Sequence, residues 1–359
     1  MKQADLYNWS ANISAPKFYP VSYISVDFGK TGAAAGVLTG IDPGWGETIG
    51  NFITGNKYKP APEDVYIRYS SGENNFIYEG IVSLPKEKIR SIFREQSHPK
   101  QLPKIKKKQI EIFSSKEDHN GAEELSPKAS TYFELIVGMA PGGWIRVWLR
   151  GNGDFDKVEI IKAQLKGHYD DTANERYKVK SFENWGKYYT YWQYHGIPYE
   201  VWANNEKEYN LQYICNNADP QFDYIIYQSI SKDGTFINGF DFLNEREKAN
   251  NKDFKKKKLP VQMTFSWHDM TKNIFYDTFV NFPKNFSSIF TRSYFDTNTK
   301  SYQNYRKLEL EIEKAGNYGK VYLVGLNKRT LLFRFKANIT KSGIVGSGDY
   351  SKEVHYFIP

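Results

Sequence analysis

The stretch PEDVYIRYSSGENNFIYEGIVSLPK, residues 62–86, occurs a second time in altered form as PVQMTFSWHDMTKNIFYDTFVNFPK, residues 260–284. The two stretches align without a gap, so that Asn75 matches Asn273 and Tyr78 matches Tyr276. The prolines at both ends coincide as well, and the apolar positions between them agree. Because the stretch is duplicated, the fold predicted for one half of the chain also predicts the fold of the other half.

Each copy predicts a strand, a polar turn and a second strand. Apolar and polar residues alternate along the first strand, which is the period of a half-buried strand. Pro85 or Pro283 then begins a helical segment, since proline suits the first turn of a helix, where its missing N–H has no partner. One face of each helix is expected to be apolar, formed by Ile89, Ile92 and Phe93 in the first copy and by Phe286, Ile289 and Phe290 in the second.

The similarity between the halves resumes at residues 132–165 and 305–339. Each of these segments predicts three strands, with a glycine-containing turn between the first two. We therefore expect an α+β fold of two similar domains, each a mainly antiparallel β-sheet with one or two packed helices. The first repeat domain is expected to span residues 1–175, and the second, diverged repeat domain residues 176–359.

The glycine-rich stretch GMAPGGWIRVWLRG, residues 138–151, has two interpretations, a phosphate-binding loop or a tight turn between strands. A phosphate loop requires a helix after the glycines, so that backbone N–H groups converge on the anion. Here the residues after the glycines are typical of a strand, as they are in the counterpart EKAGNYGKVYLVGL at 313–326. A P-loop would also need a Lys-Ser/Thr pair, which is missing. The stretch therefore predicts a hairpin turn.

Composition favours β-structure and sets limits on the partners. Aromatic residues make up 16% of the 359 residues, and tyrosine suits strands with one buried and one wet face. The net charge of +8 is modest, and no single basic stripe indicates nucleic-acid binding. The lysine runs KIKKK (104–108) and KKKK (255–258) lie beside prolines and predict solvated loops, with contact to a protein or an anionic surface as the alternative.

The residues that carry chemistry form no recognisable constellation. Cys215 is the single cysteine, expected to be a buried, inert thiol at a strand end, and no intramolecular disulfide or multi-cysteine zinc site is possible. The histidines show no ligand spacing. GHYDD (167–171) is a weak cation candidate, and we expect no metal and no cofactor. Acidic residues are distributed as surface residues are, for example Glu73, Glu79 and Glu134. No catalytic residue is predicted.

The segment FENWGKYYTYWQYHGIPYEVW, residues 182–202, is unusually rich in aromatic residues. Four of them have the i, i+3, i+4, i+7 spacing of one helix face. Such a helix either packs between the two domains or presents an aromatic platform to a protein or a sugar, since Tyr and Trp dominate binding hot spots. The candidate partner-binding residues are these four aromatics and two lysines of the second run: Trp185, Tyr188, Tyr189, Trp192, Lys255 and Lys256.

Four stretches together resemble a bacterial family of domains of unknown function, family 2931. They are WSANISAPKFYPV (9–21), DPGWG (42–46), YIRYSSGENNFIYEGIVSLPKEKI (66–89) and VGMAPGGWIRVWLRG (137–151). The second half would be a tandem, diverged copy that lacks the PGWG and APGG motifs. The family has no established catalytic residues to carry over.

The resemblance also implies a location. It suggests a bacterial envelope protein of the lipoprotein type, in the periplasm or anchored at the outer membrane. The chain has no lipobox cysteine, no apolar run long enough to span a membrane and no signal peptide before KQADLYNW. We expect Met1 to stand where a lipid-bearing cysteine that tethers the protein to the membrane was removed. If the chain is native as given, a cytoplasmic location is expected instead.

Members of this family are sometimes encoded beside secreted antibacterial effectors. The leading hypothesis is therefore a non-enzymatic binding protein, an immunity protein that neutralises a type VI secretion effector by direct binding, with that cognate effector as its partner and no nucleic acid. One alternative is a carbohydrate-binding or cell-wall-binding envelope module that uses the same aromatics. A second is an uncharacterised hydrolase, for which His268 and Asp269 offer the local support.

Overall fold

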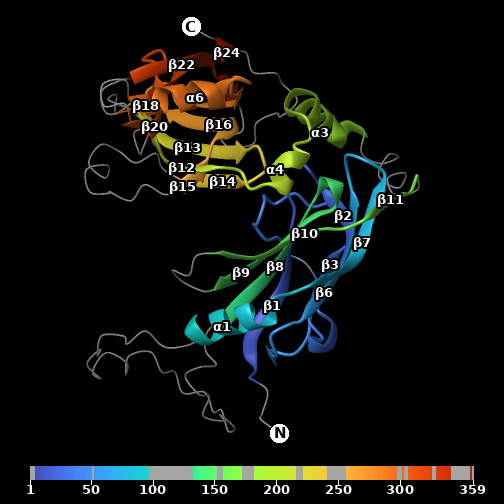
Figure 1. The fold of residues 1–359 in the computed structure, drawn as a ribbon. Coiled ribbons are helices and arrows are strands. Elements are labelled where there is room, and N and C mark those ends of the chain that lie inside the picture. Colours follow the sequence, from blue (N-terminus) through green and yellow to red (C-terminus); the bar gives the residue numbers. More distant parts are fainter. Residues whose placement is uncertain are drawn as a thin grey trace, which may run out of the picture. The chain divides into compact units, whose positions relative to one another are not determined.

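The fold is described from a computed structural model of the chain. The residues it describes are 5–50, 52–96, 132–151, 157–171, 182–215, 221–240, 256–296, 301–302, 306–325, 329–340 and 356–357. Contacts between Cα atoms group the chain into two compact units, Met1–Arg176 (unit 1) and Tyr177–Pro359 (unit 2). Each unit is described by itself, with its elements labelled as in Figure 1.

Unit 1 consists of two β-sheets that share one hydrophobic core. The strand order is β10-β9-β8-β1-β5 in the first sheet and β11-β7-β6-β2-β3-β4 in the second. The elements are β1 (Tyr7–Ser14), β2 (Val21–Asp27), η1 (Gly29–Thr31), β3 (Ala34–Val37), β4 (Phe52–Thr54), β5 (Tyr58–Lys59), β6 (Asp64–Ser71), β7 (Phe76–Ser83), α1 (Lys86–Gln96), β8 (Tyr132–Ala140), η4 (Pro141–Gly143), β9 (Trp144–Gly151), β10 (Val158–Gln164) and β11 (Gly167–Tyr169).

Unit 2 has two sheets as well, with the orders β15-β12-β20-β21-β22-β24 and β14-β13-β16-β17-β23, and a short ribbon β18-β19. Its elements are α3 (Phe182–His195), α4 (Tyr199–Ala203), β12 (Glu208–Cys215), β13 (Phe222–Ser231), β14 (Phe236–Phe240), β15 (Lys256–Lys258), β16 (Pro260–Asp269), β17 (Ile274–Asn281), α6 (Phe286–Tyr294), β18 (Phe295–Asp296), β19 (Ser301–Tyr302), β20 (Arg306–Ile312), β21 (Tyr318–Val324), β22 (Arg329–Lys336), β23 (Asn338–Thr340) and β24 (Tyr356–Phe357).

The two units share their order of strands. In each unit the first strand pairs in parallel with a strand from much later in that unit, β1 with β8 and β12 with β20. That later strand then continues into an antiparallel meander, β8-β9-β10 or β20-β21-β22. The second sheet of unit 1 also has its counterpart, since β2, β3, β6, β7 and β11 occupy the places of β13, β14, β16, β17 and β23.

The duplicated hairpins agree residue by residue. Tyr69 lies opposite Tyr78 in the pairing of β6 with β7, and Trp267 lies opposite Tyr276 in the pairing of β16 with β17. These are the residues that the gapless sequence alignment matches. The helices after the hairpins, α1 and α6, bury the predicted apolar faces, on which Ile89, Phe93, Phe286 and Phe290 have at most 3% exposure. The predicted strand, turn, strand and helix are therefore confirmed.

The glycine-rich stretch is the predicted turn and not a phosphate loop. Gly142 and Gly143 have φ angles of 78° and 79°, and the chain continues into strand β9 rather than into a helix. A Cβ atom on Gly143 would lie 2.2 Å from the backbone oxygen of Leu165, so only glycine fits. In unit 2 the corresponding turn contains Gly316, with a φ angle of 86°.

An aromatic side chain of the hairpin joins the two sheets at this turn. The Tyr69 hydroxyl, on β6, donates a hydrogen bond to the backbone oxygen of Ala140 at 2.6 Å. In unit 2 the indole N–H of Trp267, on β16, donates to the backbone oxygen of Gly316 at 2.9 Å. Both side chains are fully buried, so these two hydrogen bonds are shielded from water. The same connection is thus made in both units by different donors.

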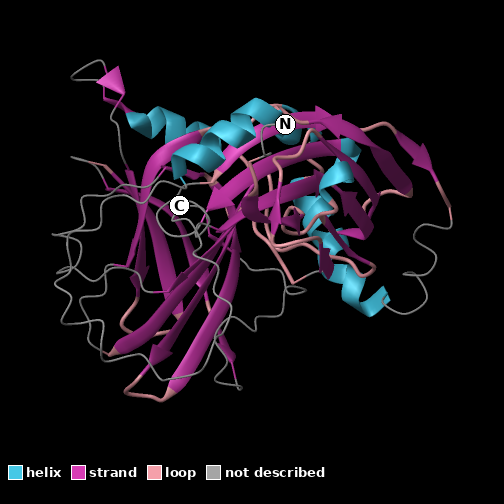
Figure 2. Ribbon diagram, turned by 90° about the horizontal axis from the view of Figure 1, so that it is seen from below, coloured by secondary structure: helices cyan, strands magenta, loops and turns pink. Residues whose placement is uncertain are grey.

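The fold class was predicted correctly at the coarse level. The chain is mostly β-sheet, rich in antiparallel pairs, and its described part has few helices (Figure 2). The parallel pair in each unit is a feature that the local sequence pattern did not reveal. Within the described residues, no helix combines the length and the apolar character needed to cross a membrane. The domain boundary at residue 175 stays a prediction.

Replacing Tyr69 with phenylalanine tests the connection between the sheets. The change Tyr69→Phe keeps the ring but removes the donor to Ala140, and leaves a buried carbonyl without this partner. We expect the free energy of unfolding, measured in urea, to fall by about 1–2 kcal/mol. The matched control is Tyr66→Phe, because the Tyr66 hydroxyl bonds the exposed side chain of Glu79. A loss no larger than that of the control would contradict the assigned role.

Candidate functional site

The aromatic segment folds as the predicted helix, and one side of it anchors α3 in unit 2. Tyr191 is 4% exposed. His195 Nε2 lies 3.2 Å from Oδ1 of Asn281, at the end of β17. Burial lowers the pKa of His195 to about 4, so the imidazole is neutral at physiological pH. The ammonium group of Lys284 lies 5.1 Å from the centre of the Tyr194 ring. Tyr191 and His195 therefore fix which side of α3 faces the unit.

The same helix also carries aromatic rings that solvent reaches. Tyr189 is 47% exposed, and Tyr188 and Trp192 are half-buried. The Trp192 ring lies 5.4 Å from the Tyr189 ring and 6.1 Å from the Tyr188 ring. The Lys187 ammonium group is 4.9 Å from the centre of the Tyr188 ring. We call Tyr188, Tyr189 and Trp192 the α3 aromatic surface. Trp185 belongs to the same helix.

The second lysine run is not the solvated loop that its sequence predicts. Lys255 lies outside the described residues, and Lys256–Lys258 form strand β15, which pairs with β12. Lys256 is exposed. Lys257 donates to the backbone oxygen of Leu211 at 2.8 Å. The prediction was wrong because it considered only the charge of the run. The edge of β12 offers backbone N–H and C=O groups with which the lysine segment pairs. Lys256 and the α3 aromatic surface lie on separate elements. The first run, 104–108, is outside the described residues.

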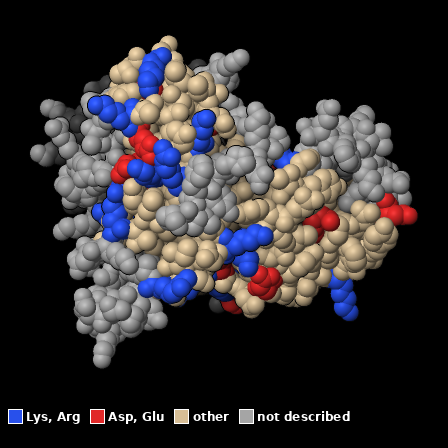
Figure 3. Space-filling model, turned by 90° about the horizontal axis from the view of Figure 1, so that it is seen from above, with Lys and Arg blue, Asp and Glu red and all other residues tan. Residues whose placement is uncertain are grey.

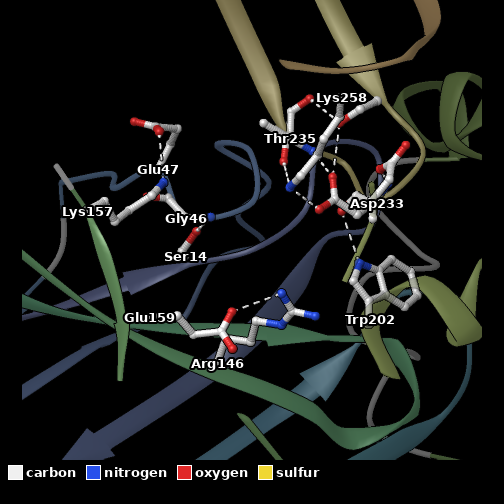
Figure 4. A network of polar contacts seen from close by, with 12 residues as sticks. Ser14, Gly46, Glu47, Arg146, Lys157, Glu159, Trp202, Asp233, Thr235 and Lys258 are labelled. Carbon is white, nitrogen blue, oxygen red and sulfur yellow. Dashed lines mark hydrogen bonds and ion pairs between the residues drawn. The ribbon is translucent and has the colours of Figure 1, made fainter. Parts of the chain in front are cut away.

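Lys258 belongs to a buried ionic cluster (Figure 4). Its ammonium group forms an ion pair with Asp233, which is 2% exposed, and donates to Thr235 Oγ1 at 2.8 Å. Asp233 Oδ1 accepts from the Ser231 hydroxyl at 3.0 Å and from the Thr235 N–H at 2.9 Å. The Asp233 N–H donates to Glu206 Oε2 at 3.0 Å. Together these bonds hold the turn between β13 and β14.

Two carboxyl groups compete for the single cation of this cluster. Burial and, next to it, the negative charge of Asp233 together raise the pKa of Glu206 to about 8. Burial also acts to raise the pKa of Asp233, but the charge of Lys258 and its hydrogen bond outweigh this and lower it. At neutral pH the cluster therefore holds an ionised Asp233 paired with Lys258 and a largely protonated Glu206.

At one end of unit 1, the four stretches that carry the family resemblance come together. The Ser14 hydroxyl donates to the Gly44 oxygen at 2.9 Å and accepts from the Gly46 N–H at 2.9 Å. The Gly72 N–H donates to the Pro20 oxygen at 2.9 Å. Tyr69 reaches Ala140, as described above. Residues 14–20, 42–46, 71–75 and 141–143 thus form one group of loops, which we call the loop end of unit 1.

Backbone strain accompanies this loop end. Phe18 has a φ angle of 65°, in the left-handed region that non-glycine residues rarely adopt. Its N–H donates to Asp42 Oδ2 at 3.2 Å, and Lys17 forms an ion pair with the same oxygen at 3.5 Å. Positions of this kind persist only where the surrounding contacts determine them, and they are concentrated at binding and active sites.

Glu73 also lies in the loop end, where it is half-buried and not an exposed surface acid as its sequence context predicts. Its carboxyl group is buried, and one oxygen accepts the hydrogen bond of Ser71. The other oxygen, Oε1, is buried without a hydrogen-bond partner. Burial raises the pKa of Glu73 to about 7, although the Ser71 hydroxyl lowers it. The only signal in the sequence is the repeat alignment, in which Ser71 and Glu73 match Asp269 and Thr271.

The structure separates the two residues offered as a hydrolase pair. His268 Nδ1 lies 2.7 Å from Asp223 Oδ1, and its ring stacks on Phe275. Asp269 is fully buried and bonds Thr271, Lys272 and Gln221 instead. Successive residues of a strand point to opposite faces, which explains the separation. Within the described part of the chain, no group of three His, Cys, Asp or Glu side chains has the arrangement of a metal site.

A family model described as "Protein of unknown function (DUF2931)" matches residues 1–200. The matched residues include all four stretches of the loop end and the helix α3. No curated protein matches the chain.

Replacing Lys258 tests the buried ionic cluster. In Lys258→Met the Asp233 carboxylate keeps its burial but loses its cation, and an uncompensated buried charge is strongly destabilising. We expect the free energy of unfolding at pH 7 to fall by about 3 kcal/mol or more. The matched control is Lys256→Met in the same strand, where the exposed lysine should matter by less than about 0.5 kcal/mol. Equal effects of the two changes would show that the ion pair has no such role.

Replacing Glu73 with glutamine tests its raised pKa. A carboxyl group whose pKa is raised on folding stabilises the fold fully below the unfolded pKa of 4.5, and this stabilisation is lost as pH rises toward 7. Glu73→Gln should therefore be more stable than the wild type at pH 8, by about 2–3 kcal/mol at most. The difference should vanish near pH 4. Chemical unfolding across this range measures it, with Glu79→Gln as the control, and a difference that does not change with pH would refute the raised pKa.

Proposed function

The chain belongs to the DUF2931 family of proteins of unknown function, and on that premise we propose that it is a non-enzymatic binding protein. Its partner is another protein, and the role we favour is that of an immunity protein which neutralises a secreted antibacterial effector of a type VI secretion system by direct binding. We place it in the bacterial envelope, in the periplasm or tethered at the outer membrane. The observation that carries the proposal is the α3 aromatic surface.

This surface has the composition of a protein-binding hot spot. Tyr and Trp bring large apolar area with few rotatable bonds, and they are enriched among residues that dominate binding energy. Tyr191 and His195 fix the helix on its unit, so the neighbouring aromatic rings on the same helix lose little conformational freedom when a partner binds. Lys187, beside Tyr188, adds a charge that favours encounter with an acidic partner.

The distribution of charge supports a protein partner rather than a polyanion. On the face drawn in Figure 3, basic and acidic side chains are interspersed, and most of the described surface there carries neither. Binding of nucleic acid relies on a concentrated basic surface that neutralises phosphates.

We further propose that unit 2 is a diverged second copy of unit 1, and that the two units are separate domains of one tandem protein. Three observations support this proposal. The strand orders correspond, the duplicated hairpins pair in the same register, and an aromatic side chain at the same position of each hairpin donates to the glycine turn of the other sheet. Duplication of a binding scaffold leaves one copy free to diverge in its surface.

Substitution of the α3 aromatic surface tests the proposed function. Purified chain is immobilised, and the secreted and envelope proteins of the producing bacterium are passed over it. We expect one stoichiometric partner, toxic when expressed alone. Tyr189→Ala and Trp192→Ala should each weaken its binding about tenfold or more, as loss of a hot-spot residue does. The matched control is Tyr169→Ala, which removes an aromatic ring with 63% exposure from β11.

Two results would overturn the proposal. One is the absence of any captured protein when the candidate effectors are known to be expressed. The other is a captured partner whose affinity changes equally little in Tyr189→Ala, Trp192→Ala and Tyr169→Ala. Saturable binding to cell-wall glycan without a protein partner would favour the carbohydrate-binding alternative.

A further inference from the structure

The hairpin turn of unit 2 shows how this fold satisfies a buried carboxylate. Asp269 accepts hydrogen bonds from the Thr271 hydroxyl at 2.8 Å and from Gln221 Nε2 at 2.6 Å. Lys272 Nζ lies 3.0 Å from Asp269 Oδ2 and donates to the backbone oxygen of Ala315 at 2.7 Å. The ammonium group thus bridges the β16–β17 turn and the β20–β21 turn. Burial acts to raise the pKa of Asp269, but these bonds outweigh it and lower the pKa to about 2.

The matching turn of unit 1 has the same parts with one missing. The alignment places Ser71 at the position of Asp269, Glu73 at that of Thr271 and Asn74 at that of Lys272. The hydroxyl and the carboxyl group have exchanged positions, and they still bond each other, since Ser71 donates to Glu73. The lysine has no counterpart, because Asn74 carries no charge. The cation that completes the turn in unit 2 is therefore not supplied by the turn of unit 1.

The surroundings of Glu73 reflect this missing cation. Its Oε1 atom is buried and has no hydrogen-bond partner. The titratable groups that face it are the hydroxyls of Tyr69 and Tyr78, whose rings stack at 5.3 Å, and both have their pKa raised, chiefly by burial. Asn74 Nδ2 lies 3.4 Å from the Tyr78 hydroxyl, and an amide brings no positive charge to Glu73. A buried carboxyl group with an open acceptor in a surface turn is poised for a cationic donor.

We infer that Glu73 anchors a binding site for a primary ammonium group, which takes the place in unit 1 that Lys272 Nζ fills in unit 2. An ammonium group has three donors, enough for the open oxygen of Glu73 and for a backbone oxygen of the facing turn, as with Ala315 in unit 2. The group comes from a lysine side chain of a protein or from a free alkylamine. Naming a partner's lysine as the source rests on the proposed function.

Titration of the full chain with n-butylammonium chloride tests this site without any partner. The readout is the carbon-13 resonance of the Glu73 carboxyl group, recorded across pH with and without the amine. We expect saturable binding in the millimolar range and a fall of about one unit or more in the apparent pKa of Glu73, because a bound cation favours the ionised carboxylate. n-Butanol, which has the same chain without the charge, should leave the pKa unchanged.

Two variants make the outcome decisive. Asn74→Lys supplies the missing ammonium group from the turn itself, so it should lower the apparent pKa of Glu73 with no amine present and abolish the response to the amine. Glu73→Gln should abolish saturable binding in the remaining turn resonances. An unchanged Glu73 pKa in both the amine titration and Asn74→Lys would overturn the inference, as would amine binding that Glu73→Gln leaves intact.

The capture experiment distinguishes the two sources of the ammonium group, a lysine of a partner protein and a free alkylamine. If a partner is found and Glu73→Gln weakens its binding about tenfold, a lysine of that partner occupies the site. If the amine binds but no protein is captured, the ammonium site stands and the proposed function fails. If a partner is captured while the amine titration and Asn74→Lys both leave Glu73 unchanged, the proposed function stands and the ammonium site fails.

Discussion

The hydrogen bond from the hairpin aromatic to the glycine turn of the facing sheet organises each unit. It joins Tyr69 to Ala140 in unit 1 and Trp267 to Gly316 in unit 2. The core between two packed sheets has few directional contacts. Apolar packing fixes the distance between the sheets better than it fixes how one sheet is shifted along the other. A buried donor with one acceptor across the core removes this freedom. The loops of one end are then held in a defined arrangement, which allows strained positions such as Phe18 to persist.

Four buried carboxyl groups show different ways in which one scaffold can tolerate an acid. Asp269 is surrounded by donors and a lysine and remains ionised. Asp233 is ionised through its pair with Lys258, while Glu206 beside it holds a proton. Glu73 accepts the hydrogen bond of the Ser71 hydroxyl but has no cation beside it in the contacts of the described residues, and burial raises its pKa to about 7. Of the four, only the carboxyl group of Glu73 has both a protonation state that changes near neutrality and an open acceptor, and this distinguishes it as a site for recognition.

Sequence patterns predicted what is local and periodic. The duplicated hairpin, the helix after it and the glycine turn could be predicted because alternation, proline and glycine act within a few residues. The α3 helix followed from aromatic spacing in the same way. The parallel pairing of β1 with β8 could not be predicted, since nothing local encodes which distant strand completes a sheet. Glu73 and Lys258 were missed for a related reason. The burial of a charged side chain depends on which distant segments pack over it. A run of lysines predicts a solvated loop, and the sequence does not show that this run pairs with the edge of β12.

The parallel strand pair also constrains the order in which each unit can fold during synthesis. In unit 1, Asn8 at the start of the chain pairs with Tyr132, so β1 stays without that neighbour until β8 has been synthesised. Native contacts that span so much sequence make folding slow, because the entropy of closing the loop is lost before the contact forms. β1 is almost entirely buried in the finished sheet and would be exposed for that interval. A chain arrested before β8 therefore presents a strand with one apolar face and no partner along its β8 edge, which makes nascent unit 1 a substrate for chaperones and a candidate for aggregation.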